Sequence, residues 1–312
     1  MAGAIGAAAA KVLGGDAMTV RQKLLLSLDR TLVLFVGVAV GSVVGASLIG
    51  GAVPPEAQAG TAGPTPVAAA HPAPVRGQAG ARLLRSAANG GTVHVGVFGD
   101  SFGDGLWAGL YQQLPTREGI AVHKLSRQAT GFTRYRTTDL LEDTRRRLAL
   151  QPIDIAVLSF GANDTQGIYH EGRGAAFMSE RWRRIVAERA GAVVALLREH
   201  GASVYWVGLP TMREPGFDAQ IRQINAFHAE LMRRLGVPFI DTANATADVG
   251  GRYAPYLTEP RTGRRFMARV NDGVHMTIPG YILVTRGLSD RIEQAIADAR
   301  GRGGVPARTA RP

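Results

Sequence analysis

Two kinds of hydrophobic pattern divide the chain. Residues 31–53 form one apolar run without a charged side chain, whereas from about residue 91 short β-rich runs alternate with longer amphipathic stretches. The second pattern is typical of β-α units around a parallel sheet. It predicts a folded α/β domain over residues 91–300, followed by a basic flexible tail over residues 301–312. Residues 54–90 are rich in Pro, Ala and Gly and lack apolar periodicity, so we predict a linker there.

The predicted domain is a three-layer α/β/α structure whose parallel sheet has about five strands. Strand-like runs lie at Val93–Phe98, Ile120–Leu125, Ile153–Ser159, Ser203–Gly208 and Pro238–Asp241. Apolar residues recur at helical spacing over Thr138–Leu150, Ser179–His200, Asp218–Leu235 and Pro279–Ala299. The last of these stretches begins with proline, which a helix tolerates in its first turn.

The apolar run 31–53 is long enough to cross a bilayer as a helix, which rises about 1.5 Å per residue. A buried core helix is the alternative, but the glycines of the run would weaken it. Basic residues precede the run, within residues 1–30, so the positive-inside tendency predicts a cytoplasmic N-terminal segment and export of the rest. Because Ala57-Gln58-Ala59 resembles a signal-peptidase site, cleavage of the anchor stays open.

Composition narrows the classes of function. The chain has no cysteine, which excludes disulfides, thiolate metal sites and a cysteine nucleophile. Its formal net charge of +11 is concentrated outside residues 91–300, in the ends and the linker. A dedicated nucleic-acid surface would need a stronger basic patch on the domain itself. We therefore predict no nucleic-acid partner.

A serine stands where the first predicted strand ends. Gly99-Asp100-Ser101 follows that strand and precedes a predicted helix, so the hydroxyl would lie at the carboxyl edge of the sheet, where open α/β folds bind ligands. A turn with a helix N-cap is the structural alternative. Residues 99–103 also match the G-x-S-x-G pattern of α/β-hydrolases, but those enzymes carry their acid and histidine in separate loops. Here the carboxylate-histidine pair near the end of the chain is Asp272-Gly273-Val274-His275.

That pair supplies what a serine nucleophile needs. Asp272 is close enough along the chain to hold one imidazole nitrogen of His275 while the other faces Ser101, which would then lose its proton to the imidazole. A surface turn is the alternative for a lone Asp-x-x-His. Asn163, in Gly161-Ala162-Asn163-Asp164, follows the third predicted strand and reaches the same edge as a donor to an oxyanion. The backbone N–H of Gly131, after the second strand, is a further candidate donor.

The chain carries four short blocks in order: GDS, a glycine after the second strand, GAND and DGVH. Together they resemble the four sequence blocks of SGNH hydrolases, also called the GDSL family. The resemblance covers roughly residues 93–300. The chain looks more closely like the bacterial domain-of-unknown-function family 459. This resemblance is carried by five segments behind an apolar run: GDSFGDGLWAGL, ATGFTR, GANDTQ, VYWVGLPTMR and NDGVHMTIPGY. Phe102 stands where the family name has leucine.

The resemblance implies a flavodoxin-like fold, no metal and no organic cofactor. It implies Ser101 as nucleophile, His275 as base and Asp272 as the residue that orients His275. The oxyanion would be bound by the backbone N–H groups of Ser101 and Gly131 and by the side chain of Asn163. Supporting roles are expected for Asp100, Asp104 and Asp164, which lie within the same blocks.

Residues 251–270 are too long for a simple connection and are rich in Arg and Tyr, so they are candidates for binding substrate, with a solvated hairpin as the alternative. Their arginines (Arg252, Arg261, Arg264, Arg265 and Arg269) suit an acidic glycan. Tyr253 or Tyr256 would stack on a sugar ring. Arg134 and Arg213 are further candidates for substrate contact.

The combined expectation is a serine esterase that removes short acyl groups, O-acetyl above all, from envelope or extracellular glycans. It would be a single-pass protein of the bacterial inner membrane, anchored through residues 31–53, with its catalytic domain in the periplasm. An O-acyltransferase with the same residues and a non-catalytic envelope-binding protein remain alternatives. The acyl group, its carrier, the oligomeric state and any protein partner stay undetermined.

Overall fold

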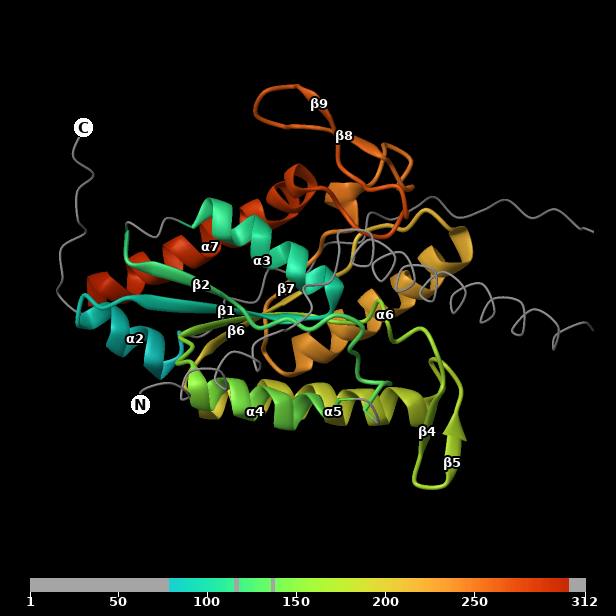
Figure 1. Ribbon diagram of the computed structural model, residues 1–312, viewed down its shortest axis with the longest axis horizontal. Helices are drawn as coiled ribbons and strands as arrows, with labels where there is room; N and C mark the ends of the chain where they lie inside the picture. Colours follow the sequence, from blue (N-terminus) through green and yellow to red (C-terminus); the bar gives the residue numbers. More distant parts are fainter. Residues whose placement is uncertain (1–78, 115–117, 136–137, 303–312) are drawn as a thin grey trace, which may run out of the picture. The chain divides into compact units, whose positions relative to one another are not determined.

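A computed structural model describes residues 79–114, 118–135 and 138–302 (Figure 1). Its central sheet has five parallel strands in the order β2-β1-β3-β6-β7. The strands are β1 (Val93–Gly99), β2 (Ile120–Lys124), β3 (Ile155–Ser159), β6 (Ser203–Val207) and β7 (Phe239–Ile240). This arrangement confirms the predicted α/β class and the parallel sheet of five strands.

Helices cover both faces of the sheet. They are α2 (Ala81–Ala88), α3 (Ser101–Gln113), α4 (Leu140–Leu150), α5 (Glu180–Glu199), α6 (Pro215–Arg234) and α7 (Ile278–Arg302), and a 3₁₀ turn, η2, spans Asn244–Thr246. Figure 1 shows α3 and α7 together on one side of the sheet and α4 and α5 on the other. Trp182 of α5 packs edge-on against Phe227 of α6, with ring centroids 5.7 Å apart, so α6 joins the second group.

The central strands are buried because helices shield them from both sides. All five residues of β3 are buried, as are six of the seven in β1, which explains their continuous apolar sequences. Trp206 on β6 lies fully buried beside the ring of His228 on α6, with centroids 4.7 Å apart. The core therefore runs through the middle of the sheet and holds the strand ends in fixed positions.

Polar caps fix where the helices begin. The side chains of Asp139, Ser179 and Glu214 accept hydrogen bonds from backbone N–H groups at the starts of α4, α5 and α6. Asp100 does the same for α3 by accepting from the N–H of Phe102 at 2.8 Å. Because a capped helix start leaves fewer unpaired N–H groups, Ser101 is held firmly as the first residue of α3.

The predicted linker over residues 54–90 is wrong at its end, because residues 81–88 form helix α2. Leu83 and Ala87 on this helix are fully buried. Gly80 also belongs to the domain, since its N–H donates to Ser203 Oγ at 2.8 Å. The pattern was missed because the helix is only eight residues long, buries just these two positions and follows a stretch rich in Pro and Ala.

Two small hairpins stand apart from the main sheet. One pairs β4 (Ile168–His170) with β5 (Arg173–Ala175), and the other pairs β8 (Tyr256–Thr258) with β9 (Arg265–Met267). The first was not predicted, and the second corresponds to the hairpin alternative for residues 251–270. Helix α7 also continues to Arg302, past the predicted end of the domain.

Among the described residues, no helix is long and apolar enough to cross a membrane. The predicted N-terminal segment (1–30), the predicted membrane run (31–53) and most of the predicted linker lie outside those residues. Residues 303–312 of the predicted tail lie outside them as well.

Candidate active site

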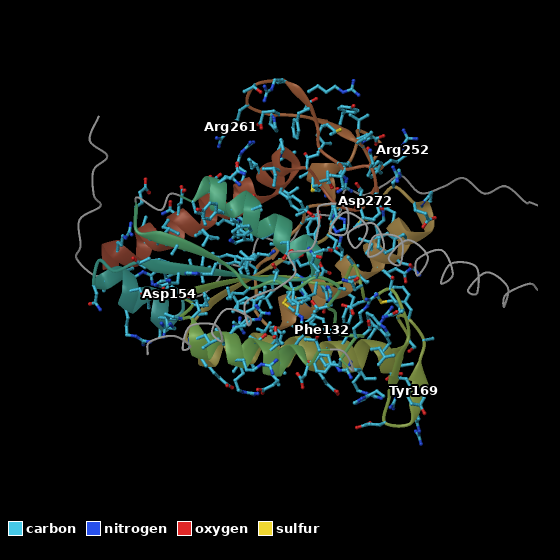
Figure 2. The ribbon with its side chains drawn as sticks, in the orientation of Figure 1. Phe132, Asp154, Tyr169, Arg252, Arg261 and Asp272 are labelled. Atoms are coloured by element: carbon cyan, nitrogen blue, oxygen red, sulfur yellow. The ribbon has the colours of Figure 1, made fainter. Side chains whose placement is uncertain are left out.

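The carboxyl ends of β1 and β3 lie side by side, because Gly99 pairs in register with Ser159. The chain leaves β1 directly into Ser101 and leaves β3 directly into the loop that carries Asn163. In Figure 2, Asp154 marks the opposite, amino-terminal end of the strands, while Asp272 lies toward their carboxyl ends. The predicted residues therefore meet at one edge of the sheet.

Ser101, His275 and Asp272 form a continuous chain of hydrogen bonds. The Oγ of Ser101 lies 2.8 Å from Nε2 of His275, and Nδ1 of His275 lies 2.7 Å from Oδ2 of Asp272. The other oxygen of Asp272 accepts from the backbone N–H groups of Val274 at 2.8 Å and His275 at 2.9 Å. The carboxylate thus closes the turn and orients the imidazole toward the serine.

Partial burial tends to raise the pKa of Asp272, but the hydrogen bonds from the His275 side chain and from the two backbone N–H groups outweigh it and lower the pKa. The carboxylate therefore stays ionised at neutral pH. An ionised Asp272 favours the tautomer in which His275 carries its proton on Nδ1, which leaves Nε2 free to accept the proton of Ser101.

The turn from Asp272 to His275 depends on a glycine and on its neighbours. Gly273 has a φ of +76°, and a Cβ built there would lie 2.5 Å from Cβ of Arg213. The backbone N–H of Arg213 donates to the carbonyl of Gly273 at 3.0 Å. The loop after β6 therefore braces the catalytic turn from the side.

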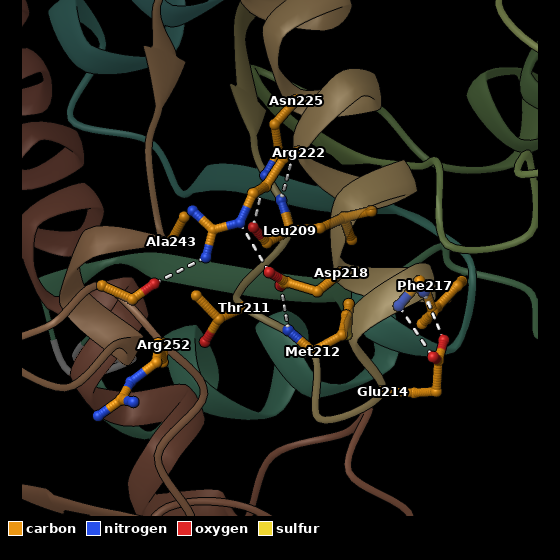
Figure 3. Close-up of polar contacts among 12 residues, drawn as sticks. Leu209, Thr211, Met212, Glu214, Phe217, Asp218, Arg222, Asn225, Ala243 and Arg252 are labelled. Atoms are coloured by element: carbon orange, nitrogen blue, oxygen red, sulfur yellow. Dashed lines mark hydrogen bonds and ion pairs between the residues drawn. The ribbon is translucent and has the colours of Figure 1, made fainter. Parts of the chain in front are cut away.

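That loop is itself fixed by helix α6, as Figure 3 shows. The side chain of Asn225 both accepts from the N–H of Leu209, at 2.9 Å, and donates to its carbonyl, at 2.7 Å. Asp218 accepts from the N–H of Met212 at 2.6 Å. These bonds place Arg213 at the catalytic turn.

Asn163 and the segment around Gly131 lie together beside Ser101. The amide of Asn163 donates to the carbonyl of Thr130 at 3.0 Å and to Oδ2 of Asp100 at 3.2 Å. A Cβ added to Gly131 would lie 2.5 Å from Oδ1 of Asp164, so only glycine fits there. The structure thus brings together all the groups predicted to bind an oxyanion.

Two fully buried carboxyl groups flank this region. Burial raises the pKa of Asp100 to about 7, although the bond from the Phe102 N–H works against the shift. Burial likewise raises the pKa of Asp164, opposed by hydrogen bonds from the N–H and the hydroxyl of Thr133. Both groups shape the loops that surround Asn163.

Asp104 supports the site from one turn further along α3. It forms a short hydrogen bond with Ser126, accepts from Gln128 at 3.1 Å and pairs with Lys124 at 2.9 Å. Burial opposes the effect, but these bonds lower the pKa of Asp104. Its carboxylate therefore ties α3 to the loop that leads from β2 to Gly131.

Comparison with known proteins places the chain in a family. Residues 94–291 match the family described as protein of unknown function, DUF459. The chain belongs to this family. No curated protein matches the sequence. The matched range contains every residue of the candidate site, so the geometry above belongs to the DUF459 portion of the chain.

Several solved structures are similar to this DUF459 chain at low identity. A GDSL-like lipase of Bacteroides thetaiotaomicron is 16 % identical, with a TM-score of 0.44, over 66 % of this chain and 88 % of its own. A mutant of Axe2, an acetylxylan esterase of Geobacillus stearothermophilus, is 16 % identical, with a TM-score of 0.46, over 66 % and 95 %. An inhibitor-bound aryl esterase of M. smegmatis is 16 % identical, with a TM-score of 0.46, over 65 % and 100 %. Likenesses this weak carry no conclusion about the function of this chain.

The predicted substrate contacts of the DUF459 chain fall into three places. Arg213 contacts the turn from Asp272 to His275, and Arg134 lines a cavity beside the loop of Gly131. Tyr256 and Arg264 belong to the β8–β9 hairpin, where the Tyr256 ring lies 4.8 Å from the guanidinium of Arg265. The role of that hairpin in substrate binding stays a prediction.

The prediction that Arg269, in the 251–270 segment, contacts a glycan is wrong. It is only 1 % exposed, so it cannot meet a glycan at the surface. Its guanidinium lies 5.0 Å from the ring of Tyr253, and Nη1 donates to the carbonyl of Val274 at 3.5 Å. It packs beneath the catalytic turn, and nothing in the residue pattern distinguished it from its exposed neighbours. Tyr253, as its ring partner, belongs to this packing.

Thr130 and Tyr281 were also missed. The carbonyl of Thr130 orients Asn163, and a backbone acceptor leaves no trace in a side-chain pattern. Tyr281 of α7 packs on Phe102, next to the nucleophile, with ring centroids 5.3 Å apart. Within the described ranges, no three His, Asp or Glu side chains converge in a way that would hold a metal ion.

Proposed function

We propose that this protein is a serine esterase of the SGNH type that removes short acyl groups, O-acetyl above all, from glycans outside the cytoplasm. The observation that carries the proposal is the unbroken relay from Ser101 through His275 to Asp272 at the carboxyl edge of the sheet. A serine alcohol becomes a useful nucleophile only when a correctly oriented base removes its proton. The relay supplies that base and its orientation.

The reaction begins when Ser101 Oγ attacks the ester carbonyl and passes its proton to Nε2 of His275. Asp272 stabilises the imidazolium that forms. The tetrahedral intermediate collapses as the C–O bond to the alcohol breaks, and the imidazolium gives its proton to the departing alkoxide. His275 then takes a proton from water, whose oxygen attacks the acyl carbon. The bond from that carbon to Ser101 Oγ breaks, the imidazolium returns the proton to Oγ, and the acid leaves.

The negative oxygen of the intermediate is bound by the backbone N–H groups of Ser101 and Gly131 and by the amide of Asn163. That amide already donates at 3.0 Å to Thr130 and, more loosely, at 3.2 Å to Asp100. We expect the bond to Thr130 to persist as the anchor of the side chain. The longer bond to Asp100 is the one that yields to the oxyanion.

Water is favoured over a sugar hydroxyl as the acyl acceptor because the relay is open to solvent. The side chains of His275 and Asp272 are 37 % and 45 % exposed, whereas a transferase needs a site that excludes water. The glycan substrate and the periplasmic location, with an anchor at residues 31–53, follow from the sequence pattern and its resemblance.

The test is acetate release from an aryl acetate by the purified full-length protein. We expect steady release without an added acceptor, its loss in Ser101→Ala, and its retention in Ser86→Ala. Ser86 is the matched control because it bonds to Asp154 at the opposite end of the sheet, at 2.9 Å. Release of the aryl alcohol only after a sugar is added, with the acetyl group recovered on that sugar and not as free acetate, would replace the esterase by a transferase. A folded protein inactive under both conditions would contradict both enzymes.

A further inference from the structure

A cavity of about 250 Å³ lies beside the oxyanion loops, outside the residues used in the mechanism. Three of its lining residues, Thr133, Arg134 and Tyr135, follow Gly131 along the chain. Gln166 and Tyr169 come from the loop and strand after Asn163, and Arg189 comes from α5. Figure 2 shows Tyr169 on the β4–β5 hairpin. The cavity is therefore built from the two segments that also carry the predicted oxyanion donors.

Hydrogen bonds join the cavity wall to the oxyanion loops. The amide of Gln166 donates to Oγ1 of Thr133 at 3.2 Å, and that hydroxyl lies 3.3 Å from the carbonyl of Asn163. The N–H of Thr133 donates to Asp164 at 2.8 Å. A group bound in the cavity would thus be held by the same framework that positions Asn163.

Two guanidinium groups face this space, and the cavity lining contains no carboxylate. Arg189 is held in place, since it donates to the carbonyl of Phe132 and its guanidinium lies 4.2 Å from the Tyr135 ring. Arg134 makes one long bond, at 3.4 Å, to the carbonyl of Ala129. Its Nε is buried and has no hydrogen-bond partner among the described residues. That Nε has almost no surface a ligand could reach, so the contact to an anion in the cavity would come from the Nη groups of Arg134, one of which makes the long bond to Ala129.

The charged groups around the cavity favour a ligand with a single negative charge. Asp139, Asp164 and Glu188 all act electrostatically on Arg189, so part of the positive field is already offset. A planar carboxylate can accept two parallel hydrogen bonds from one guanidinium. A doubly charged phosphate would meet more repulsion from the neighbouring acidic groups.

We propose that this cavity binds a carboxylate-bearing sugar of the acylated glycan, with Arg134 and Arg189 holding the carboxylate. The proposal rests on the esterase function and specifies its substrate class. Tyr169, whose side chain is exposed, offers a ring face to a sugar, and Thr133 and Gln166 offer polar contacts to its hydroxyls. The volume is below the ~300–1,000 Å³ of typical drug-sized pockets, so one sugar unit fits rather than several.

The carboxylate can come from a uronic acid or from the lactyl group of a muramic acid. Binding is measured by calorimetry on full-length Ser101→Ala, so the result does not depend on turnover. The ligands are trigalacturonate, the disaccharide of N-acetylglucosamine and N-acetylmuramic acid, and neutral maltotriose. We expect at least one acidic sugar to bind tenfold or more tightly than maltotriose, and the one that binds identifies the source.

Variants in the same background test the residues. Arg134→Gln is expected to reduce the affinity for the acidic sugar to that for maltotriose, and Arg134→Lys to retain part of it. The control is Arg145→Gln, because Arg145 is an exposed arginine on α4 that pairs with Glu142, and it is expected to leave binding unchanged.

Equal binding of acidic and neutral sugars, or an equal effect of Arg134→Gln and Arg145→Gln, would overturn the proposal. So would displacement of the sugar by millimolar inorganic phosphate at constant ionic strength. Failure of the esterase function would appear separately, as absent acetate release in the wild type.

Discussion

At the scale of single residues, the site combines an exposed relay with buried supports. His275 and Asp272 are open to solvent, while Asp100 and Asp164 behind the oxyanion loops are fully buried. In the proposed mechanism, the exposed groups move protons between substrate and water. The buried groups hold backbone and amide donors in place, which lets those donors act without rearranging during the reaction.

Asn163→Ala tests the amide of the oxyanion site. We expect kcat to fall by about 10²–10³, because one preorganised donor to the developing negative charge is removed. Steady-state kinetics with an aryl acetate measures the effect. Asn244→Ala is the matched control, since Asn244 is exposed and bonds only locally to Asp241. Equal rates in wild type and Asn163→Ala would remove Asn163 from the site.

Asp100 should make stability depend on pH. Burial raises its pKa in the folded protein to about 7 from the ordinary value of 3.8, so between these pH values the folded state keeps a proton that the unfolded state has lost. The free energy of unfolding therefore falls as pH rises from about 4 to about 7, by an amount on the order of 4 kcal/mol. The contribution is fully present below pH 4.

Asp100→Asn removes this titration. We expect the difference in unfolding free energy, variant minus wild type, to increase steadily across that window and to level off above it. Urea unfolding at several pH values measures the slope, which a constant offset from the new amide does not affect. A difference that stays constant from pH 4 to 8 would show that Asp100 titrates normally in the folded protein.

At the scale of elements, the contact between α3 and α7 holds the nucleophile close to the histidine. Ser101 begins α3, and α7 starts three residues after His275, at Ile278. Gly105 and Gly109 allow the helices to approach, because a Cβ at Gly105 would lie 1.9 Å from the Tyr281 ring and one at Gly109 would lie 2.8 Å from the Tyr281 carbonyl. Close packing of these helices therefore sets the distance across the relay.

Gly105→Ala should overpack this contact. We expect a loss of about 1–3 kcal/mol in the free energy of unfolding, together with a lower kcat, as the helices move apart. The control is Gly287→Ala on α7, where nothing lies within 4 Å of the added carbon. There we expect a stability gain of up to about 1 kcal/mol, because alanine favours a helix. Equal stability changes in the two variants would contradict the packing account.

The strands and long helices could be predicted because their patterns are strong. β1 and β3 are buried on both faces and read as continuous apolar runs, while α5 and α6 show clear helical spacing. Helix α2 has only Leu83 and Ala87 as buried anchors, and β4 and β5 are three residues each. Such short segments take their structure from tertiary contacts that no local pattern reveals.

At the scale of the whole molecule, strand order brings distant parts of the chain together. β1 lies between β2 and β3 in the sheet, so the loops after these three strands converge on one edge. The relay residues could be predicted from their order along the chain, because they belong to short motifs, one directly after β1 and one shortly before α7. Arg269 and the cavity beside Arg134 could not be, since burial and enclosure depend on how separate loops pack.

The most direct test of the central claim is to locate the covalent adduct formed by a serine-reactive fluorophosphonate on the full-length protein. Intact-mass and peptide mass spectrometry should find one adduct, on Ser101, that forms far more slowly in His275→Ala and is absent from Ser101→Ala. That result would show that His275 activates Ser101 in solution. A folded wild-type protein that forms no adduct, or forms it on another serine, would contradict the account.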